Sequence, residues 1–156
     1  FINAQFDRTV TWRDAHWLRD VWAGPFAIKG IATADDARRA IAIGAEAVWG
    51  SNHGGRQLGA APATIDTLPP IADAVRGDAE IIFDGGVRRG SDIAAAIALG
   101  ANAVALGRAY LWGLAAGGED GVHRALTILG EELRRTMALL GRSNIAGLTR
   151  DLVFRR

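Results

Sequence analysis

The sequence predicts an α/β fold, and within that class a (β/α)8 TIM barrel of which about four βα units are present. Short apolar segments alternate with amphipathic helical segments, a pattern typical of a parallel sheet covered by helices. In addition, residues 40–48 are nearly reproduced by residues 96–104, two βα units later. Because alternate strands of a barrel fill equivalent layers, repetition by pairs of units favours a barrel. A doubly wound sheet is the alternative, although no Gly-x-Gly-x-x-Gly motif follows a predicted strand.

The expected helices have residues of known preference at their ends. Thr11 and Thr33 are each followed three positions later by an aspartate, the spacing of a capping box, and so mark two helix starts. A Gly-Pro pair stops the first of these helices, and a glycine closes the second. Pro69 and Pro70 lie inside the third helical segment and predict an interruption or a kink near its middle.

The strands are expected where short apolar runs end at glycine or at polar residues. In chain order, the expected elements are a loop over 1–10, a helix over 11–23, a strand over 26–29, a helix over 33–43, a strand over 46–50, a loop to 62, a helix over 63–75, a strand over 80–83, a helix over 91–99, a strand over 102–106, a short helix over 110–115 and a long helix over 121–140.

Length and composition limit the functions that need consideration. A chain of 156 residues with 49% hydrophobic residues fits one domain with its own core. A formal net charge of +1 gives no field that would favour nucleic acid or a membrane surface. The absence of cysteine excludes disulfides, thiol nucleophiles and thiolate zinc sites, and it fits a reducing cytosol. Since the sequence opens at Phe1 without a methionine, we expect it to be a piece of a longer polypeptide.

The residues that could bind a ligand or take part in catalysis all follow predicted strands. Because the carboxyl ends of barrel strands form one face, where active sites are built, these residues predict a single site. They are Lys29 after the first strand, Ser51, His53 and Arg56 after the second, Asp84, Gly85, Gly86, Val87 and Arg88 after the third, and Gly107 and Arg108 after the fourth.

Two glycine-rich segments in this set predict a phosphate site. Residues 85–90 and the pair Gly107-Arg108 each precede a predicted helix, so they offer open backbone amides, a positive helix end and guanidinium groups. In barrels, phosphate commonly binds between the loops after strands seven and eight. Two ordinary turns with surface arginines are the alternative interpretation, and we favour phosphate.

His53 and Arg56 form a second constellation. Histidine exchanges a proton near neutral pH, and the planar fork of arginine matches a carboxylate, so the pair suits a small acid that loses a proton. Lys29 suits imine formation, stabilisation of an anion or a buried salt bridge, and the sequence leaves these open. Asp84 suits a contact with a ligand hydroxyl or an anchor for its loop.

Six blocks of the sequence together resemble the FMN-dependent L-2-hydroxy acid oxidases and dehydrogenases. This family includes glycolate oxidase, lactate oxidase and monooxygenase, mandelate dehydrogenase and the flavin-dependent L-lactate dehydrogenases. The resemblance covers essentially the whole chain, in order, and the blocks at residues 51–58 and 84–90 are specific when they occur together. The blocks are residues 29–31, 51–58, 62–64, 84–90, 98–101 and 107–114.

The resemblance implies that residues 1–156 are the second, C-terminal half of a single FMN-binding TIM-barrel domain. It implies oxidation of a small L-2-hydroxy acid, lactate-like, to the 2-oxo acid, with His53 as the base and Arg56 on the substrate carboxylate. The remaining residues would bind FMN: Lys29 and Ser51 at the flavin ring, Asp84 at the ribityl chain, and Gly85, Gly86, Val87, Arg88, Gly107 and Arg108 around the phosphate.

The same resemblance implies several partners. We expect the chain's own upstream half-barrel to complete the site, a homo-oligomer (a tetramer by resemblance), no nucleic acid, and a cytoplasmic location, with peripheral attachment to the inner face of the membrane left open. Two positions depart from the family: Gly59-Ala60 replaces the usual Asp-Gly, and Trp49-Gly50 replaces small β-branched residues. An inactive half-barrel fragment and another phosphate-binding barrel enzyme that uses Lys29 are the alternatives.

Overall fold

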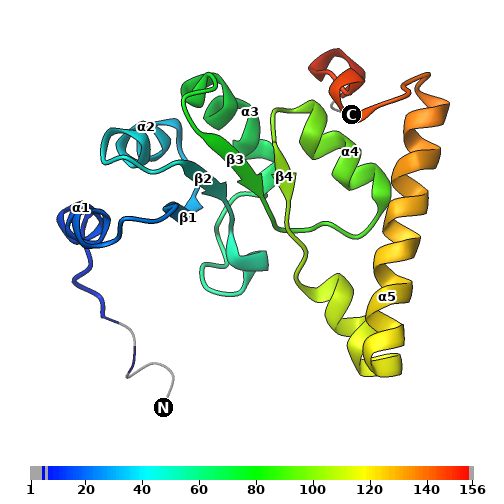
Figure 1. Cartoon of the computed structure of the whole chain (residues 1–156), viewed down its shortest axis with the longest axis horizontal. Helices are drawn as coiled ribbons and strands as arrows, with labels where there is room; N and C mark the ends of the chain where they lie inside the picture. The colour runs from blue at the N-terminus through cyan, green and yellow to red at the C-terminus, as the bar shows by residue number, and fades with distance from the viewer. Residues whose placement is uncertain (1–4, 6, 155–156) are drawn as a thin grey trace.

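The computed structural model describes residue 5 and residues 7–154, so part of the expected N-terminal loop, residues 1–4 and 6, lies outside the described residues. Its sheet is parallel throughout and has the order β1-β2-β3-β4, the order of the chain (Figure 1). A doubly wound sheet reverses its strand order at a switch point. Within the described residues the strand order shows no such reversal. The strands are β1 (Ala27–Ile31), β2 (Ala47–Gly50), β3 (Glu80–Phe83) and β4 (Ala103–Val104).

Helices connect these strands in the predicted alternation. The helices are α1 (Trp12–Val21), α2 (Ala34–Ala42), α3 (Thr64–Val75), α4 (Gly90–Ala98) and α5 (Arg108–Leu139), with short 3-10 turns η2 (His53–Gly55), η3 (Ile145–Gly147) and η4 (Arg150–Leu152). Both predicted capping boxes mark true helix starts: the backbone amide of Thr11 donates to Asp14, and the amide of Asp36 donates to the hydroxyl of Thr33. Strand β4 is shorter than expected, because only Ala103 and Val104 pair with β3.

The two prolines do not interrupt α3, so the prediction of an interruption was wrong. The helix runs continuously from Thr64 to Val75 through Pro69 and Pro70. Leu68, Ile71 and Val75 on one face of α3 are completely buried against the sheet and α2. Each such burial contributes roughly 1.5–3 kcal/mol. Together these contributions offset the cost of two interior prolines, about 3 kcal/mol each, so tertiary packing keeps the helix continuous.

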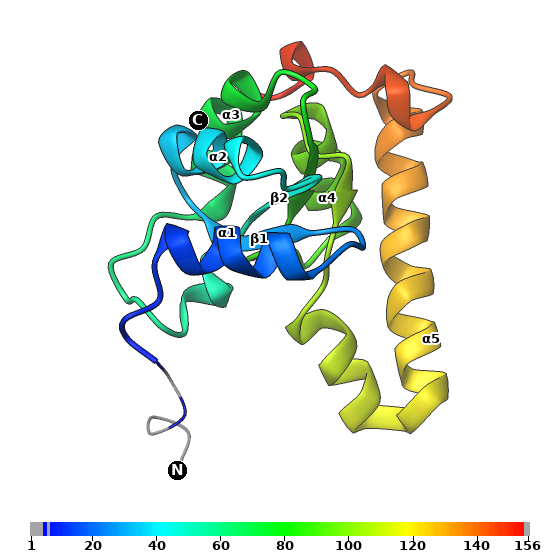
Figure 2. The ribbon, with the colours of Figure 1, turned by 60° about the vertical axis from the view of Figure 1, so that its left-hand side comes forward.

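Helix α5 consists of two arms, as the sequence predicted. Its backbone leaves helical geometry at Gly117 and Gly118, where the chain turns back on itself (Figure 2). The first arm follows β4, the second arm packs along α4, and both arms contribute residues to the site described below. The hydrophobic core lies between the sheet and α2, α3 and α4, so the carboxyl ends of the strands are held by a packed base.

Candidate active site

A cavity of about 850 Å³ opens at the carboxyl ends of the strands. Residues from the ends of all four strands and from both arms of α5 line it. The predicted site residues Lys29, His53, Arg56, Asp84, Gly85, Gly86, Val87, Arg88, Gly107 and Arg108 all belong to its lining, together with Trp49. Ser51 alone among the predicted residues is not in this lining; it is buried, with an exposed fraction of 6%, and lines a second cavity of about 240 Å³ together with His53.

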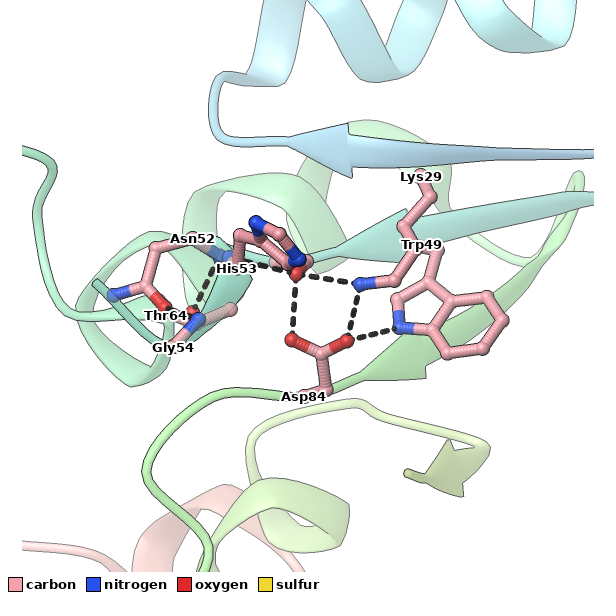
Figure 3. A network of polar contacts seen from close by, with 8 residues as sticks. Lys29, Trp49, Asn52, His53, Gly54, Thr64 and Asp84 are labelled. Atoms are coloured by element: carbon pink, nitrogen blue, oxygen red, sulfur yellow. Dashed lines mark hydrogen bonds and ion pairs between the residues drawn. The ribbon is translucent and has the colours of Figure 1, made fainter. Parts of the chain in front are cut away.

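Lys29, Ser51 and Asp84 form one polar network (Figure 3). The ammonium of Lys29 donates to Ser51 Oγ at 2.7 Å and also forms a salt bridge with Asp84 Oδ2. The hydroxyl of Ser51 donates to Asp84 Oδ1 at 2.5 Å. Of the three interpretations that the sequence left open for Lys29, the salt bridge is therefore present, and Asp84 anchors the ends of three strands.

Trp49 is a member of this network that the sequence reasoning did not identify. Its indole Nε1 donates to Asp84 Oδ2 at 3.0 Å, and its ring centroid lies 4.8 Å from the Lys29 ammonium (Figure 3). Its position two residues before Ser51 was the available signal, because alternate residues of a strand face the same side. The contact of Trp49 with Lys29 could not be predicted in this way, since it depends on the register that pairs the two residues across β1 and β2.

The turn that carries His53 has an uncommon backbone. His53 has φ 54°, and Gly54 and Gly55 follow with φ 66° and 73°. A left-handed conformation costs a non-glycine residue about 1–2 kcal/mol, so the surrounding structure must hold the turn in place. The amide of His53 donates to Ser51 Oγ at 3.1 Å, and the amide of Gly54 donates to Asn52 Oδ1 at 3.0 Å.

Asn52 and Thr64 extend this support into α3 and its preceding loop. The amide of Asn52 donates to Thr64 Oγ1 at 3.2 Å, and its side-chain Nδ2 donates to the carbonyl of Pro62 at 3.1 Å. Sequence reasoning missed both residues. The tendency of asparagine to bind the backbone two residues later was a signal for Asn52, whereas the contact of Thr64 depends on the fold.

The loop after β3 presents open backbone amides to the cavity. Within residues 7–154, the amides of Gly85, Gly86 and Val87 donate to no acceptor. A Cβ at Gly86 or Gly107 would meet nothing within 4 Å, so a ligand can approach the backbone there. Gly85 differs, because a Cβ would lie 2.6 Å from Thr64 Oγ1, and its φ of 99° also favours glycine.

The N-terminus of α4 is already occupied by acidic side chains. Asp92 accepts hydrogen bonds from the amides of Arg88 and Arg89 at 2.8 and 2.9 Å, and Glu132 of α5 accepts one from Gly90 at 2.9 Å. The Gly90 amide and then the Arg89 guanidinium lower the pKa of the Glu132 carboxyl. The amides available for an anion are consequently those of residues 85–87, one turn before the helix end that the sequence suggested.

Cationic side chains surround these amides. Within the described chain, the side chains of His53, Arg56 and Arg88 make no hydrogen bond or ion pair, and so they are free to bind a ligand. Arg108 lies at the start of α5 and donates from Nη2 to the carbonyl of Gly54 at 3.0 Å. The lining contains one carboxylate, Asp84, and four lysine or arginine side chains, so its net charge is positive and suits an anion. These four are Lys29, Arg56, Arg88 and Arg108.

Known proteins resemble this chain along essentially its whole length. The family model described as FMN-dependent dehydrogenase matches residues 1–155. An L-lactate dehydrogenase of Vibrio cholerae is 44% identical over 156 residues, and one of Pseudomonas entomophila is 46% identical over 155 residues. They are matched over 100% and 99% of this chain, which spans 41% of the length of each of these relatives.

Solved structures show the same fold. The crystal structure of a monotopic membrane protein, (S)-mandelate dehydrogenase, superposes with a TM-score of 0.94 at 43% identity, covering 99% of this chain and 41% of that one. A mandelate oxidase with (S)-4-hydroxymandelic acid gives 0.85 at 45% identity, covering 90% and 40%. The four βα units therefore match part of a flavin-dependent TIM barrel. Among residues 7–154, no helix is both long and apolar enough to span a membrane.

Proposed function

The chain belongs to the family of FMN-dependent dehydrogenases, and on that premise we propose that it forms part of an enzyme that oxidises a small, lactate-like L-2-hydroxy acid to the 2-oxo acid. The observation that carries this proposal is the composition of the cavity. One space brings together a histidine and an arginine whose side chains have no partner among the described residues, a lysine in a polar network, and open amides beside further arginines. The first two suit the acid, and the others suit a phosphorylated cofactor.

Several features of the cavity fit FMN, on which the family depends. The free amides of residues 85–87, with Arg88, Gly107 and Arg108, would hold the phosphate. Asp84 has about four acceptor sites as a carboxylate. Three of them are used by Lys29, Ser51 and Trp49, which leaves one for a ribityl hydroxyl. When bound, FMN supplies the acceptor for the two electrons of the oxidation.

The fit is different for Ser51, which was expected to contact the flavin. Its hydroxyl donates to Asp84 and accepts from Lys29 and from the amide of His53. One donor and two lone pairs are all that a hydroxyl offers. We therefore infer that Ser51 acts by holding Lys29, Asp84 and the turn of His53, and that Lys29 presents its charge to the cofactor ring.

In the proposed reaction, the chain binds the acid and moves one proton. The guanidinium of Arg56 binds the substrate carboxylate through two parallel hydrogen bonds. A ring nitrogen of His53 takes a proton from the substrate, either from the α-carbon or from the hydroxyl. The positive charge of Lys29 stabilises the negative charge that develops on reduction. Because the amides of His53 and Gly54 are hydrogen-bonded, the backbone that carries the ring is held in place before the acid arrives.

We also propose that residues 1–156 are the C-terminal half of one FMN-binding barrel and that the upstream half of the same protein completes it. The chain spans 41% of its relatives' length, and β1 and β4 are the two open edges of the described sheet. At the end of α1, Val21 and Trp22 are largely exposed, which fits a surface that another part of the protein covers. A homo-oligomer in the cytoplasm, free or attached to the inner face of the membrane, belongs to the same proposal.

The test is anaerobic reduction of the full-length protein. We expect a yellow protein that releases FMN on denaturation and that lactate, glycolate or mandelate bleaches without oxygen. Substitution of His53 by glutamine should abolish bleaching while FMN stays bound, and substitution of Arg56 by lysine should raise KM. A protein that binds FMN but is bleached by none of these acids contradicts the proposal. Borohydride trapping of a carbonyl substrate on Lys29 would support the imine enzyme in its place.

A further inference from the structure

Trp49 occupies the floor of the cavity from the middle of the sheet. In β2 the side chain of Val48 is completely buried on the helix side, so Trp49 points to the opposite side, where it lines the cavity. The strand register pairs it with Lys29 on one side and with Ile82 on the other. Trp49 is thus the direct neighbour of Lys29, in a place where the sequence indicated a departure from the family pattern.

The indole contacts both members of the salt bridge with different parts of the ring system. Its Nε1 donates to Asp84 Oδ2 at 3.0 Å, the same oxygen that accepts from Lys29. Its ring face carries the Lys29 ammonium at 4.8 Å from the centroid, within the range of a cation–π interaction. Phenylalanine at this position could make the second contact only, and an aliphatic residue could make neither.

We propose that Trp49 is a positioning residue that fixes the Lys29 ammonium and the Asp84 carboxylate relative to each other and covers one side of the pair against water. The Lys29 side chain is 45% exposed and the Asp84 side chain 17%, so the pair lies where the cavity meets the sheet. Without the indole, water would also reach both groups from the side that the ring covers, and it would screen the charge of Lys29. Only the identity of the ligand that feels this charge, FMN, rests on the proposed function.

The first measurement needs no cofactor. Lys29 is the only lysine among the 156 residues, so the peptide that contains it reports one amine. The full-length protein, freed of FMN, is acetylated with a limiting amount of acetic anhydride, and the labelling rate of Lys29 is read by peptide mass mapping. Loss of the cation–π contact and of the shielding ring should raise this rate by about two- to fivefold in Trp49→Leu. Trp49→Phe, which keeps a ring face and most of the volume, should give a smaller increase.

The second measurement is the dissociation constant of FMN in the same variants. We expect weaker binding in the same order, with Trp49→Leu more affected than Trp49→Phe. Trp17→Phe on α1 is the matched control, since it also removes an indole N–H but lies outside the cavity lining. Circular dichroism and the thermal midpoint identify any variant that fails to fold, and Trp49→Phe then carries the test.

The outcomes separate clearly. A graded increase in Lys29 labelling, with an unchanged rate in Trp17→Phe, supports the proposal. Equal rates in the wild type and both Trp49 variants overturn it, and so does an equal increase in all three variants, which would indicate general loosening. If the wild type binds no FMN, the proposed function fails, but the labelling order still decides whether Trp49 positions Lys29.

Discussion

The guanidinium of Arg108 donates a hydrogen bond to the backbone carbonyl of Gly54 at 3.0 Å, across 54 residues of sequence. This bond joins the start of α5 to the turn that carries His53. Gly54 is closely approached by the arginine, since a Cβ at Gly54 would lie 3.0 Å from Arg108 Nη2. Arg108 therefore connects the proposed phosphate site with the proposed base, whereas the Arg88 side chain has no such contact within residues 7–154.

Substitution of these two arginines by glutamine should have different effects. Each change removes a charged donor from the proposed phosphate site, and a hydrogen bond to a charged group contributes roughly 1.5–3 kcal/mol. We expect FMN binding to weaken by about ten- to a hundredfold in both variants of the full-length protein. At saturating FMN, kcat should fall in Arg108→Gln only, because only this variant also loosens the His53 turn. Equal kcat values in the two variants would contradict the coupling.

Asn52 should be needed for the geometry of the same turn. Replacement by alanine removes the bonds to the Gly54 amide and to the Pro62 carbonyl, and each is expected to contribute about 0.5–1.5 kcal/mol. Aspartate keeps the acceptor for Gly54 and loses only the donor. We predict that kcat/KM and the denaturant midpoint fall in the order wild type, Asn52→Asp, Asn52→Ala. An alanine variant with wild-type activity would show that the turn is held without Asn52.

Local sequence signals were sufficient for the elements and for the face that carries the site. The capping residues Thr11 and Thr33 depend on neighbours three positions away, and the polar residues that follow strands meet wherever parallel strands end. The predictions that failed or were missed depend on contacts between residues far apart in the sequence. Burial of α3 overrode its two prolines, and the contact of Trp49 with Lys29 depends on the register between β1 and β2. The hydrogen bond from Gly90 to Glu132 spans 42 residues, so no local pattern announced it.

Glu132 should make stability depend on pH in a defined direction. The Gly90 amide, and after it the Arg89 side chain, lowers the pKa of the Glu132 carboxyl from its ordinary value of 4.5. A carboxyl with a lowered pKa in the folded state stabilises the protein above its unfolded-state pKa, and this contribution is lost as the pH falls through the folded-state value. Glu132→Gln should therefore lower the urea midpoint at neutral pH, and its difference from the wild type should shrink below pH 4.5.

The control for this pH effect is the neighbouring residue. The side chain of Glu131 makes no hydrogen bond or ion pair within residues 7–154, so Glu131→Gln removes the same charge without removing a contact to α4. We expect a small difference in the urea midpoint for this variant. If the deficit of Glu132→Gln relative to the wild type were the same in acid as at neutral pH, the contribution would come from packing rather than from the ionised carboxylate.

The close packing of the two arms of α5 should require a glycine at position 113. A Cβ there would lie 2.4 Å from the carbonyl oxygen of Gly121, and a Cβ at Gly121 would lie 1.9 Å from the carbonyl oxygen of Gly113. Both obstacles are backbone, so Gly113→Ala must separate the arms, at a cost of typically 1–3 kcal/mol.

Gly130 is the matched control, because it lies in the same helix and a Cβ would approach only the end of Arg134, at 3.8 Å. Gly130→Ala should be neutral or stabilising by up to about 1 kcal/mol, through helix propensity alone. Urea denaturation of the full-length variants gives both values, and because the first arm lines the cavity, Gly113→Ala should also weaken FMN binding while Gly130→Ala leaves it unchanged. Similar stabilities for the two variants would show that the arms can move apart without cost.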